Sequence, residues 1–279
     1  MRRSFALMLA LVVSAPAGAF AQAPDDDPAA LKLAVPDFAL VGLPTTLRLP
    51  RFGSSFRVTH RFLRPLTGDD VDFGDVLDDF FGIDAGAQIG LEYRFGIIRN
   101  GQIGIHRTSN RTIEFFAQYA ALREGANAPL DVSVLGTIEG TNNFHEDNDV
   151  GSSHSPALGA IISRTVGDVA AFYVEPIWVN NTNSDPSELV DDNDTLMIGL
   201  GARIRVRPTV YLVGEFAPRA TGYKPGVNHG SVGIEKRAGG HLFQLNFSNA
   251  FGTTMAQIAR GGPVENDWSI GFNISRKFF

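Results

Sequence analysis

Apolar and polar residues alternate with a period of two in about twelve segments of this chain, and no other feature limits its fold as strongly. In the clearest segment, residues 195–206, Leu196 and Leu200 lie on the apolar face, whereas Arg203 and Arg205 lie on the other. Successive side chains of a β-strand point to opposite faces, so each segment predicts a strand that is apolar on one side only. The sequence therefore predicts an all-β protein.

The connections between these segments alternate between short and long. Single-chain bacterial outer-membrane barrels have an even number of strands, short periplasmic turns and longer extracellular loops. The sequence thus predicts a closed antiparallel transmembrane β-barrel of about 12 strands, with both ends of the barrel chain in the periplasm. A fused or split strand would make the number ten or fourteen.

The expected strands are 55–63, 88–95, 102–108, 112–122, 131–139, 156–165, 169–180, 195–206, 209–217, 230–237, 241–249 and 267–278. The expected short turns are 96–101, 123–129, 166–168, 207–208 and 238–240, and the expected long loops are 64–84, 140–155, 181–194, 218–229 and 250–266. The short connection around Ser109 and Asn110 is the exception.

The N-terminus has the layout of an export signal. Two arginines precede an apolar run over residues 5–13 and then small residues, which predicts a cleaved signal peptide over residues 1–23, cut after Ala21 or Ala23. Residues 24–53 are rich in proline and aspartate and weakly patterned, so we expect a weakly structured periplasmic segment there. Residues 54–279 form the predicted barrel domain. A membrane helix needs about 20 consecutive apolar residues, and no later stretch supplies them, so only a closed sheet could hold this chain in a membrane.

Composition excludes several classes of function. The chain has no cysteine, which rules out disulfides, thiolate nucleophiles and Cys-based metal sites. Loss of the signal would remove two basic residues, leaving 22 Lys and Arg against 30 Asp and Glu. An acidic chain is a poor match for nucleic acid, whose phosphates need a basic patch.

The last strand carries the pattern that barrel-insertion machinery recognises by adding that strand to the edge of its own sheet. Phe278 is in phase with the apolar face and Phe279 is one place out; an ordinary last strand without this role is the alternative. The predicted insertion signal comprises Trp268, Ile270, Phe272, Ile274, Phe278 and Phe279.

The polar face of the strands predicts a charged lumen. Because about twelve strands lie between filled eight-stranded and open sixteen-stranded barrels, these residues could line a narrow pathway or pair with one another and fill the barrel. The candidate lumen residues are Arg57, Arg61, Glu92, Arg94, Glu114, Asp131, Glu139, Glu175, Arg203, Arg205, Glu215 and Glu235.

Three of the predicted outer loops are acidic. Such clusters can bind calcium or magnesium, but the spacing matches no EF-hand, so solvated loops and no cofactor are the expectation. In the first loop, Val76, Leu77, Phe80 and Phe81 have helical spacing, which predicts a short helix folded into the barrel mouth. The acidic residues are Asp69, Asp70, Asp72, Asp75, Asp78, Asp79 and Asp84, then Glu146, Asp147 and Asp149, then Asp185, Glu188, Asp191, Asp192 and Asp194.

The chain resembles a family of bacterial outer-membrane β-barrel proteins of unknown function. The resemblance rests on the HRF at residues 60–62, DFFGID at 79–84, GLEY at 90–93 and IGIHRTSN at 103–110, with His106 where a small residue is expected. It implies a barrel over nearly the whole mature chain and no activity.

We therefore expect a narrow passive pore or a structural barrel in the outer membrane, in contact with outer-membrane lipid, lipopolysaccharide and, during assembly, the insertion machinery; the oligomeric state stays open. A membrane-embedded lipid hydrolase is the first alternative, and a soluble periplasmic β-protein is the second. No G-x-S-x-G motif supports the hydrolase. Its candidate residues are His229 and Ser231 on one strand face, and His145 and His154 with Ser152, Ser153 and Ser155 in one loop.

Overall fold

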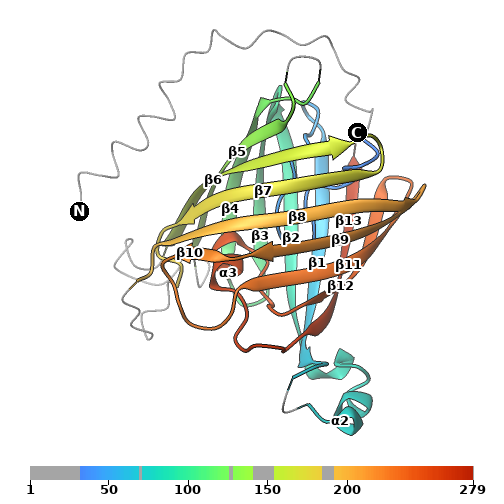
Figure 1. Ribbon diagram of the computed structural model, residues 1–279, viewed down its shortest axis with the longest axis vertical. Helices are drawn as coiled ribbons and strands as arrows, with labels where there is room; N and C mark the ends of the chain where they lie inside the picture. Colours follow the sequence, from blue (N-terminus) through green and yellow to red (C-terminus); the bar gives the residue numbers. More distant parts are fainter. Residues whose placement is uncertain (1–31, 69–70, 126–127, 141–153, 184–191, 279) are drawn as a thin grey trace. The chain divides into compact units, whose positions relative to one another are not determined.

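A computed structural model describes residues 32–68, 71–125, 128–140, 154–183 and 192–278 of the chain. The contacts within the chain separate two units, Met1–Ala30 and Leu31–Phe279. The first contains the predicted signal peptide and lies outside the described residues. The second contains the fold. In the described part, twelve long antiparallel strands form a barrel (Figure 1). They are β1 (Ser54–Pro65), β2 (Ala87–Ile98), β3 (Gly101–Thr108), β4 (Ile113–Leu122), β5 (Asp131–Gly140), β6 (His154–Val166), β7 (Ala170–Val179), β8 (Thr195–Arg207), β9 (Val210–Ala217), β11 (His229–Ala238), β12 (His241–Ser248) and β13 (Ser269–Phe278). A short thirteenth strand, β10 (Arg219–Thr221), extends the pairing of β8 beyond β9.

Each long strand pairs with its sequence neighbours, and β1 pairs with β13 to close the sheet. Ser54 lies opposite Phe278 and Val58 opposite Ile274 in this closing pair. Closure leaves no unpaired strand edge, which a sheet inside a bilayer requires because lipid offers no hydrogen bonds. The predicted twelve-stranded barrel is confirmed.

The connections alternate as the sequence predicts. The turns after β2, β4, β6, β8 and β11 are short and gather at one end, the short-turn end, together with the start of β1 and the end of β13. The strand ends that the longer connections join lie at the other end, the long-loop end, together with the short connection at residues 109–112. Asn100 and Gly239 adopt left-handed backbone conformations in two of the tight turns, as hairpins of this length require.

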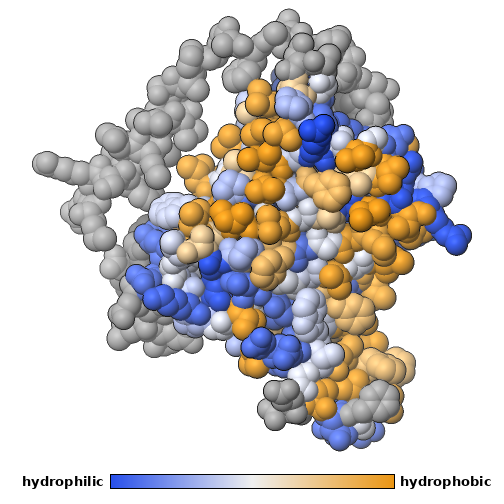
Figure 2. All heavy atoms as spheres, in the orientation of Figure 1, coloured by the Kyte–Doolittle hydropathy of each residue, from blue (hydrophilic) through white to orange (hydrophobic). Residues whose placement is uncertain are grey.

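The outer wall of the barrel is apolar. Figure 2 shows apolar side chains over much of its visible surface. No helix within the described residues is long and apolar enough to span a membrane. Large exposed apolar surfaces are unfavourable in water but suit contact with lipid. Outward side chains that are exposed include Leu91, Phe115, Phe172, Val174, Leu200, Ile204, Leu212, Ile234, Phe243 and Leu245.

The interior contains residues 33–50, which we call the plug. The prediction of a weakly structured periplasmic segment is wrong for these residues, although they form no strand of the barrel sheet. Leu40, Val41 and Leu43 are at most 1% exposed. The Leu40 amide donates to the Leu43 carbonyl (2.8 Å), and the Thr45 amide donates to the Phe38 carbonyl (2.8 Å), so the plug is a hairpin. A twelve-stranded lumen has room for such a hairpin, and the burial of its apolar side chains stabilises it there.

Two of the connections at the long-loop end contain helices. The helix expected in the first loop exists as α2 (Phe73–Asp78), followed by η1 (Ile83–Ala85), but it does not enter the mouth. Figure 1 shows α2 beyond the end of the barrel, where Leu77, Phe80 and Phe81 are exposed. A helix that the sequence did not predict, α3 (Met255–Arg260) between β12 and β13, is buried instead.

Candidate functional site

The candidate site is the lumen, where the barrel wall meets the plug and α3. Eleven of the twelve candidate lumen residues are buried, at 8% exposure or less, and Arg205 is half-buried. They lie at the inward positions of eight different strands, so residues far apart in the sequence converge on one space. These buried residues are Arg57, Arg61, Glu92, Arg94, Glu114, Asp131, Glu139, Glu175, Arg203, Glu215 and Glu235.

Glu215 of β9 holds the tip of the plug hairpin. Its carboxylate accepts hydrogen bonds from the backbone N–H groups of Val41 (2.9 Å), Gly42 (2.7 Å) and Leu43 (3.0 Å). The Nε2 atom of His229 lies 2.8 Å from the same carboxylate. Hydrogen bonds to an ionised carboxylate are stronger than neutral ones, so this contact fixes the tip.

The absence of a side chain at Gly42 allows the plug tip to approach the Glu215 carboxylate closely. A Cβ atom at this position would lie 3.2 Å from Oε1 of Glu215 and 3.1 Å from Cδ1 of Ile258 in α3. Both distances are tighter than ordinary contacts, so a side chain here would force the tip away from the carboxylate.

The carbonyl groups of the plug bind donors on other strands. The Val41 carbonyl accepts hydrogen bonds from Arg57, from Nη2 of Arg61 (3.3 Å) and from Nδ2 of Asn273 (3.0 Å). The Leu40 carbonyl accepts from Nε2 of Gln244 (2.8 Å). Buried backbone groups need such partners, and here the wall supplies them.

Arg203 and Glu235 form a fully buried ion pair. Nε of Arg203 lies 2.8 Å from Oε2 of Glu235, and Nη2 lies 2.9 Å from Oε1, a two-point contact of the kind that guanidinium and carboxylate favour. Nη2 also donates to the Ala39 carbonyl (2.6 Å). The pair therefore joins the barrel wall to the plug.

A second charged group lies across the lumen. Nη2 of Arg94 is 2.8 Å from Oε1 of Glu92, and Nη1 of Arg57 is 3.7 Å from Oε2 of Glu92. Gln118, which accepts from Arg94 (3.1 Å), donates to the Thr45 carbonyl of the plug (2.8 Å). A cavity of about 30 Å³ remains beside these residues, enough for one or two water molecules.

Helix α3 packs inside the lumen near the long-loop end. The Met255 amide donates to Oε1 of Glu114 (2.9 Å), and the Ala256 amide donates to Oε2 of Glu139 (3.1 Å). The two carboxylates therefore satisfy N–H groups in the first turn, which have no partner inside a helix. Ile258 of α3 adjoins the plug tip at Gly42, so the plug and α3 meet inside the lumen.

The plug enters and leaves the lumen through the short-turn end. At its start, Lys32 lies 2.5 Å from Asp131, the first residue of β5, and Lys277 near the end of β13 donates to the Pro36 carbonyl. At its finish, the chain passes directly into Ser54 of β1. Both described ends of the plug therefore lie at the short-turn end.

The residues proposed for a hydrolase lie in the lumen or outside the described residues. His229 and Ser231 are at most 2% exposed and point inward, away from lipid. In a Ser-His-acid relay the serine and the acid contact different ring nitrogens, but Oγ of Ser231 (3.3 Å) and Oε1 of Glu215 (2.8 Å) both face Nε2. Oγ of Ser155 donates to the Asn181 carbonyl (2.6 Å), His154 begins β6, and His145, Ser152 and Ser153 are not described. Among the described residues, the contacts of His229, Ser231 and Glu215 therefore differ from that relay geometry.

Several acidic candidates in the described parts of the loops make contacts other than with a metal ion. In the part of the chain that the structure describes, no group of three His, Cys, Asp or Glu residues could hold an ion. Asp72 caps α2, while Asp75 and Asp79 lie 3.4 and 2.6 Å from Arg64. Asp192 lies 3.6 Å from Lys224, and Asp194 accepts from Asn180 (2.5 Å). The candidates Asp69, Asp70, Glu146, Asp147, Asp149, Asp185, Glu188 and Asp191 lie outside the described residues.

The predicted insertion signal falls on β13. Ile270, Phe272, Ile274 and Phe278 occupy its outward positions, Trp268 precedes the strand, and Phe279 is not described. Its recognition during assembly stays a prediction.

We expect Phe278→Ala to lower the folded fraction in the outer membrane several-fold, because Phe278 is the last outward side chain of β13, the strand that the insertion machinery is expected to bind. The measurement is the heat-modifiable band in membrane fractions. Phe247→Ala, which removes an outward phenylalanine of β12, is the matched control. An equal loss of the folded fraction in both variants would show that the effect comes from lost lipid contact and not from recognition by the insertion machinery.

The fold and the occupied lumen define a class: a membrane β-barrel with a segment of its own chain folded inside it. The chain belongs to the family of membrane-bound beta barrel domains (DUF5777), whose family model matches residues 38–278 and so includes the plug tip. This membership corrects the soluble alternative. No curated protein matches the chain.

The chain is also similar to solved barrels at low identity. Outer membrane phospholipase A of Escherichia coli is 14% identical, with a TM-score of 0.44, over 80% of this chain and 89% of the phospholipase. A mutant of the Rhodopseudomonas blastica porin is 11% identical, with a TM-score of 0.35, over 74% of this chain and 58% of the porin. OpdK of Pseudomonas aeruginosa is 10% identical, with a TM-score of 0.36, over 69% of this chain and 57% of OpdK. None of these likenesses bears on activity.

Sequence reasoning missed the plug, α3 and the contact between Glu215 and His229. The plug has a signal in the apolar run of residues 38–43, which is unusual for a solvated segment. The other contacts join residues whose proximity depends on barrel closure, and no local pattern marks them.

Proposed function

We propose that this chain is a non-enzymatic outer-membrane pore whose plug closes the lumen at rest and withdraws when the barrel conducts. The observation that carries the proposal is how the plug is held. Its buried backbone groups bind charged and amide side chains of the wall, Glu215 foremost, and it shares no strand pairing with the sheet. Those wall groups can bind water once the plug leaves, so the closed and the open barrel both satisfy them.

The short-turn end would face the periplasm, as in single-chain outer-membrane barrels generally. The plug would then withdraw into the periplasm, the side on which it is tethered to β1. Because acidic and basic side chains both line the lumen, small hydrophilic solutes and ions are the proposed cargo, without preference for one sign of charge. A barrel that stays permanently filled is the competing reading.

Planar-bilayer recordings test this proposal. A mature chain that lacks residues 33–50 should give stepwise currents, whereas the full mature chain should be silent at low voltage. Heat-modifiable mobility shows whether the shortened chain still folds. A shortened chain that folds and yet carries no current would contradict the proposal, because the lumen would then be blocked by something other than the plug, such as α3.

A reversible disulfide between the plug and the barrel wall provides the matched control in the full chain. Oγ of Thr46 in the plug lies 2.6 Å from Oγ of Ser163 on β6, and the sulfur atoms of a disulfide lie about 2.05 Å apart. The double variant Thr46→Cys and Ser163→Cys should therefore cross-link, in a chain with no other cysteine. Under mild urea or raised voltage, the oxidised form should stay silent and the reduced form should conduct; equal currents in both forms would contradict a moving plug.

A further inference from the structure

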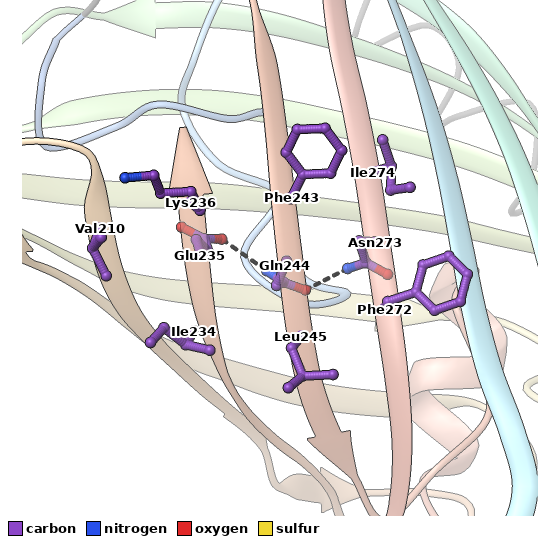
Figure 3. Close-up of a pocket in the computed structure, with 10 residues that line it drawn as sticks. All are labelled: Val210, Ile234, Glu235, Lys236, Phe243, Gln244, Leu245, Phe272, Asn273 and Ile274. Carbon is purple, nitrogen blue, oxygen red and sulfur yellow. Dashed lines mark hydrogen bonds between the residues drawn. The ribbon is translucent and has the colours of Figure 1, made fainter. Parts of the chain in front are cut away.

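The outer wall carries a groove that the closed lumen does not explain. It crosses β9, β11, β12 and β13 and has a volume of about 520 Å³. Its two sides are tiers of outward residues that the strand register sets side by side, Lys236, Phe243 and Ile274 in one and Ile234, Leu245 and Phe272 in the other. Figure 3 shows these tiers on either side of Glu235, Gln244 and Asn273, which hydrogen-bond to one another.

The floor of the groove is closed to water. Glu235, Gln244 and Asn273 are at most 4% exposed and belong to the network that binds the plug. The sides are apolar, and Ile234, Phe243 and Leu245 are each more than 40% exposed. An occupant must therefore be apolar along most of its length.

Two cations stand at the short-turn end of the groove. Lys236 and Arg276 are exposed at outward positions, each two residues from the end of its strand, or about 7 Å at the usual rise of a strand. Nζ of Lys236 donates to Oγ1 of Thr209 in the β8–β9 turn (2.8 Å), so the ammonium group points toward the short-turn end on the β9 side of β11 and has two N–H donors left. Nη1 of Arg276 lies 3.4 Å from Nε2 of His241.

The geometry points to a binding site for one anionic phospholipid of the leaflet at the short-turn end, with an acyl chain in the groove and its phosphate between Lys236 and Arg276. These side chains project from β11 and β13, which are two strands apart, and the register places Arg276 two residues nearer the short-turn end than Lys236, so their backbones are about 12 Å apart. A phosphodiester headgroup can bridge them when both side chains turn toward β12. Basic residues beside apolar grooves at membrane depth recognise anionic headgroups in this way. The inference rests on the proposed orientation, in which this leaflet is the periplasmic one, and not on plug movement.

Charge complementarity selects this occupant over a second copy of the chain. A copy would bring another Lys236 and Arg276 toward the same rim, and like charges in a medium of low dielectric repel. A lipid instead has an apolar acyl chain, which matches the groove, followed by an anionic headgroup, which matches the cations at the short-turn end of the groove.

Native mass spectrometry of the full mature barrel in detergent tests the site, with phosphatidylglycerol and phosphatidylcholine of identical acyl chains as probes. We expect retention of one phosphatidylglycerol, at least fivefold above phosphatidylcholine. Lys236→Gln combined with Arg276→Gln should lower that retention at least fivefold. Arg164→Gln is the control, because Arg164 is also exposed at an outward position near the short-turn end, but on β6, away from the groove.

Equal retention of the two lipids, an equal loss in the Arg164→Gln control, or unchanged retention in the double variant would each overturn the site. A dimer that the double variant abolishes would show a second copy in the groove and would overturn it as well. Because the measurement does not depend on current, a barrel that binds the lipid but never conducts would count against the pore alone.

Discussion

Replacing Glu215 by alanine is expected to release the plug. The carboxylate accepts three plug N–H groups and faces His229, so the variant leaves at least three buried donors without their acceptor. At about 1 kcal/mol for each donor, docking of the plug should weaken by roughly 3 kcal/mol, or about a hundredfold in the population of the open state. A cysteine placed at Leu43, which is fully buried, reports this opening, because the chain has no other thiol.

The measurement is the rate at which a water-soluble maleimide labels Leu43→Cys in liposomes, with and without Glu215→Ala. Glu175→Gln is the matched control: Glu175 is also a fully buried inward glutamate, but among the described residues its carboxylate oxygens have no hydrogen-bond partner. Labelling should rise about a hundredfold for Glu215→Ala and little for the control. Similar rates in the two variants would mean that apolar packing, and not Glu215, holds the plug.

Breaking the Arg203–Glu235 pair should give the largest loss of barrel stability. Both side chains are completely buried, so Arg203→Ala leaves the Glu235 carboxylate buried without its charged partner and removes the donor to the Ala39 carbonyl. Removal of one partner of a buried pair costs about 3–5 kcal/mol. The free energy of unfolding in urea, followed by heat-modifiable mobility, should fall by about that amount.

The double variant Arg203→Met with Glu235→Met tests the reason for this loss. Without a stranded charge, it should recover about half of the lost stability or more. The surface variant Arg164→Ala should change the free energy of unfolding by about 0.5 kcal/mol or less, since Arg164 is exposed. A double variant as unstable as Arg203→Ala would show that the network to Ala39 and Gln244, and not the buried charge, sets the stability.

The strands could be predicted because each one is encoded locally. Leu196, Ile198 and Leu200 face outward in β8 because a strand alternates its side chains, and the same rule placed Arg203 inside. Loop length predicted the strand order, since a short turn, expected at 207–208 and found at 208–209, joins adjacent antiparallel strands. The candidate lumen residues could be predicted from the same alternation, because they occupy the polar positions of each strand.

The contacts within the lumen followed from no local rule. The Val41 carbonyl meets Asn273, 232 positions away, and Met255 meets Glu114, 141 positions away. Such pairs form only after closure sets the width of the lumen. The helix near Val76 illustrates the limit: its spacing predicted the helix, but not that Leu77 would remain exposed outside the barrel.

The sequence by itself determined a twelve-stranded membrane barrel, the side of the wall that each strand residue faces and the end at which the turns are short, because a period of two and the length of a turn act between neighbours. The tertiary structure alone decided what occupies the lumen. Whether the plug and α3 fit inside, and whether Glu215 meets the tip at Gly42, depends on the diameter and register that closure of β1 on β13 imposes.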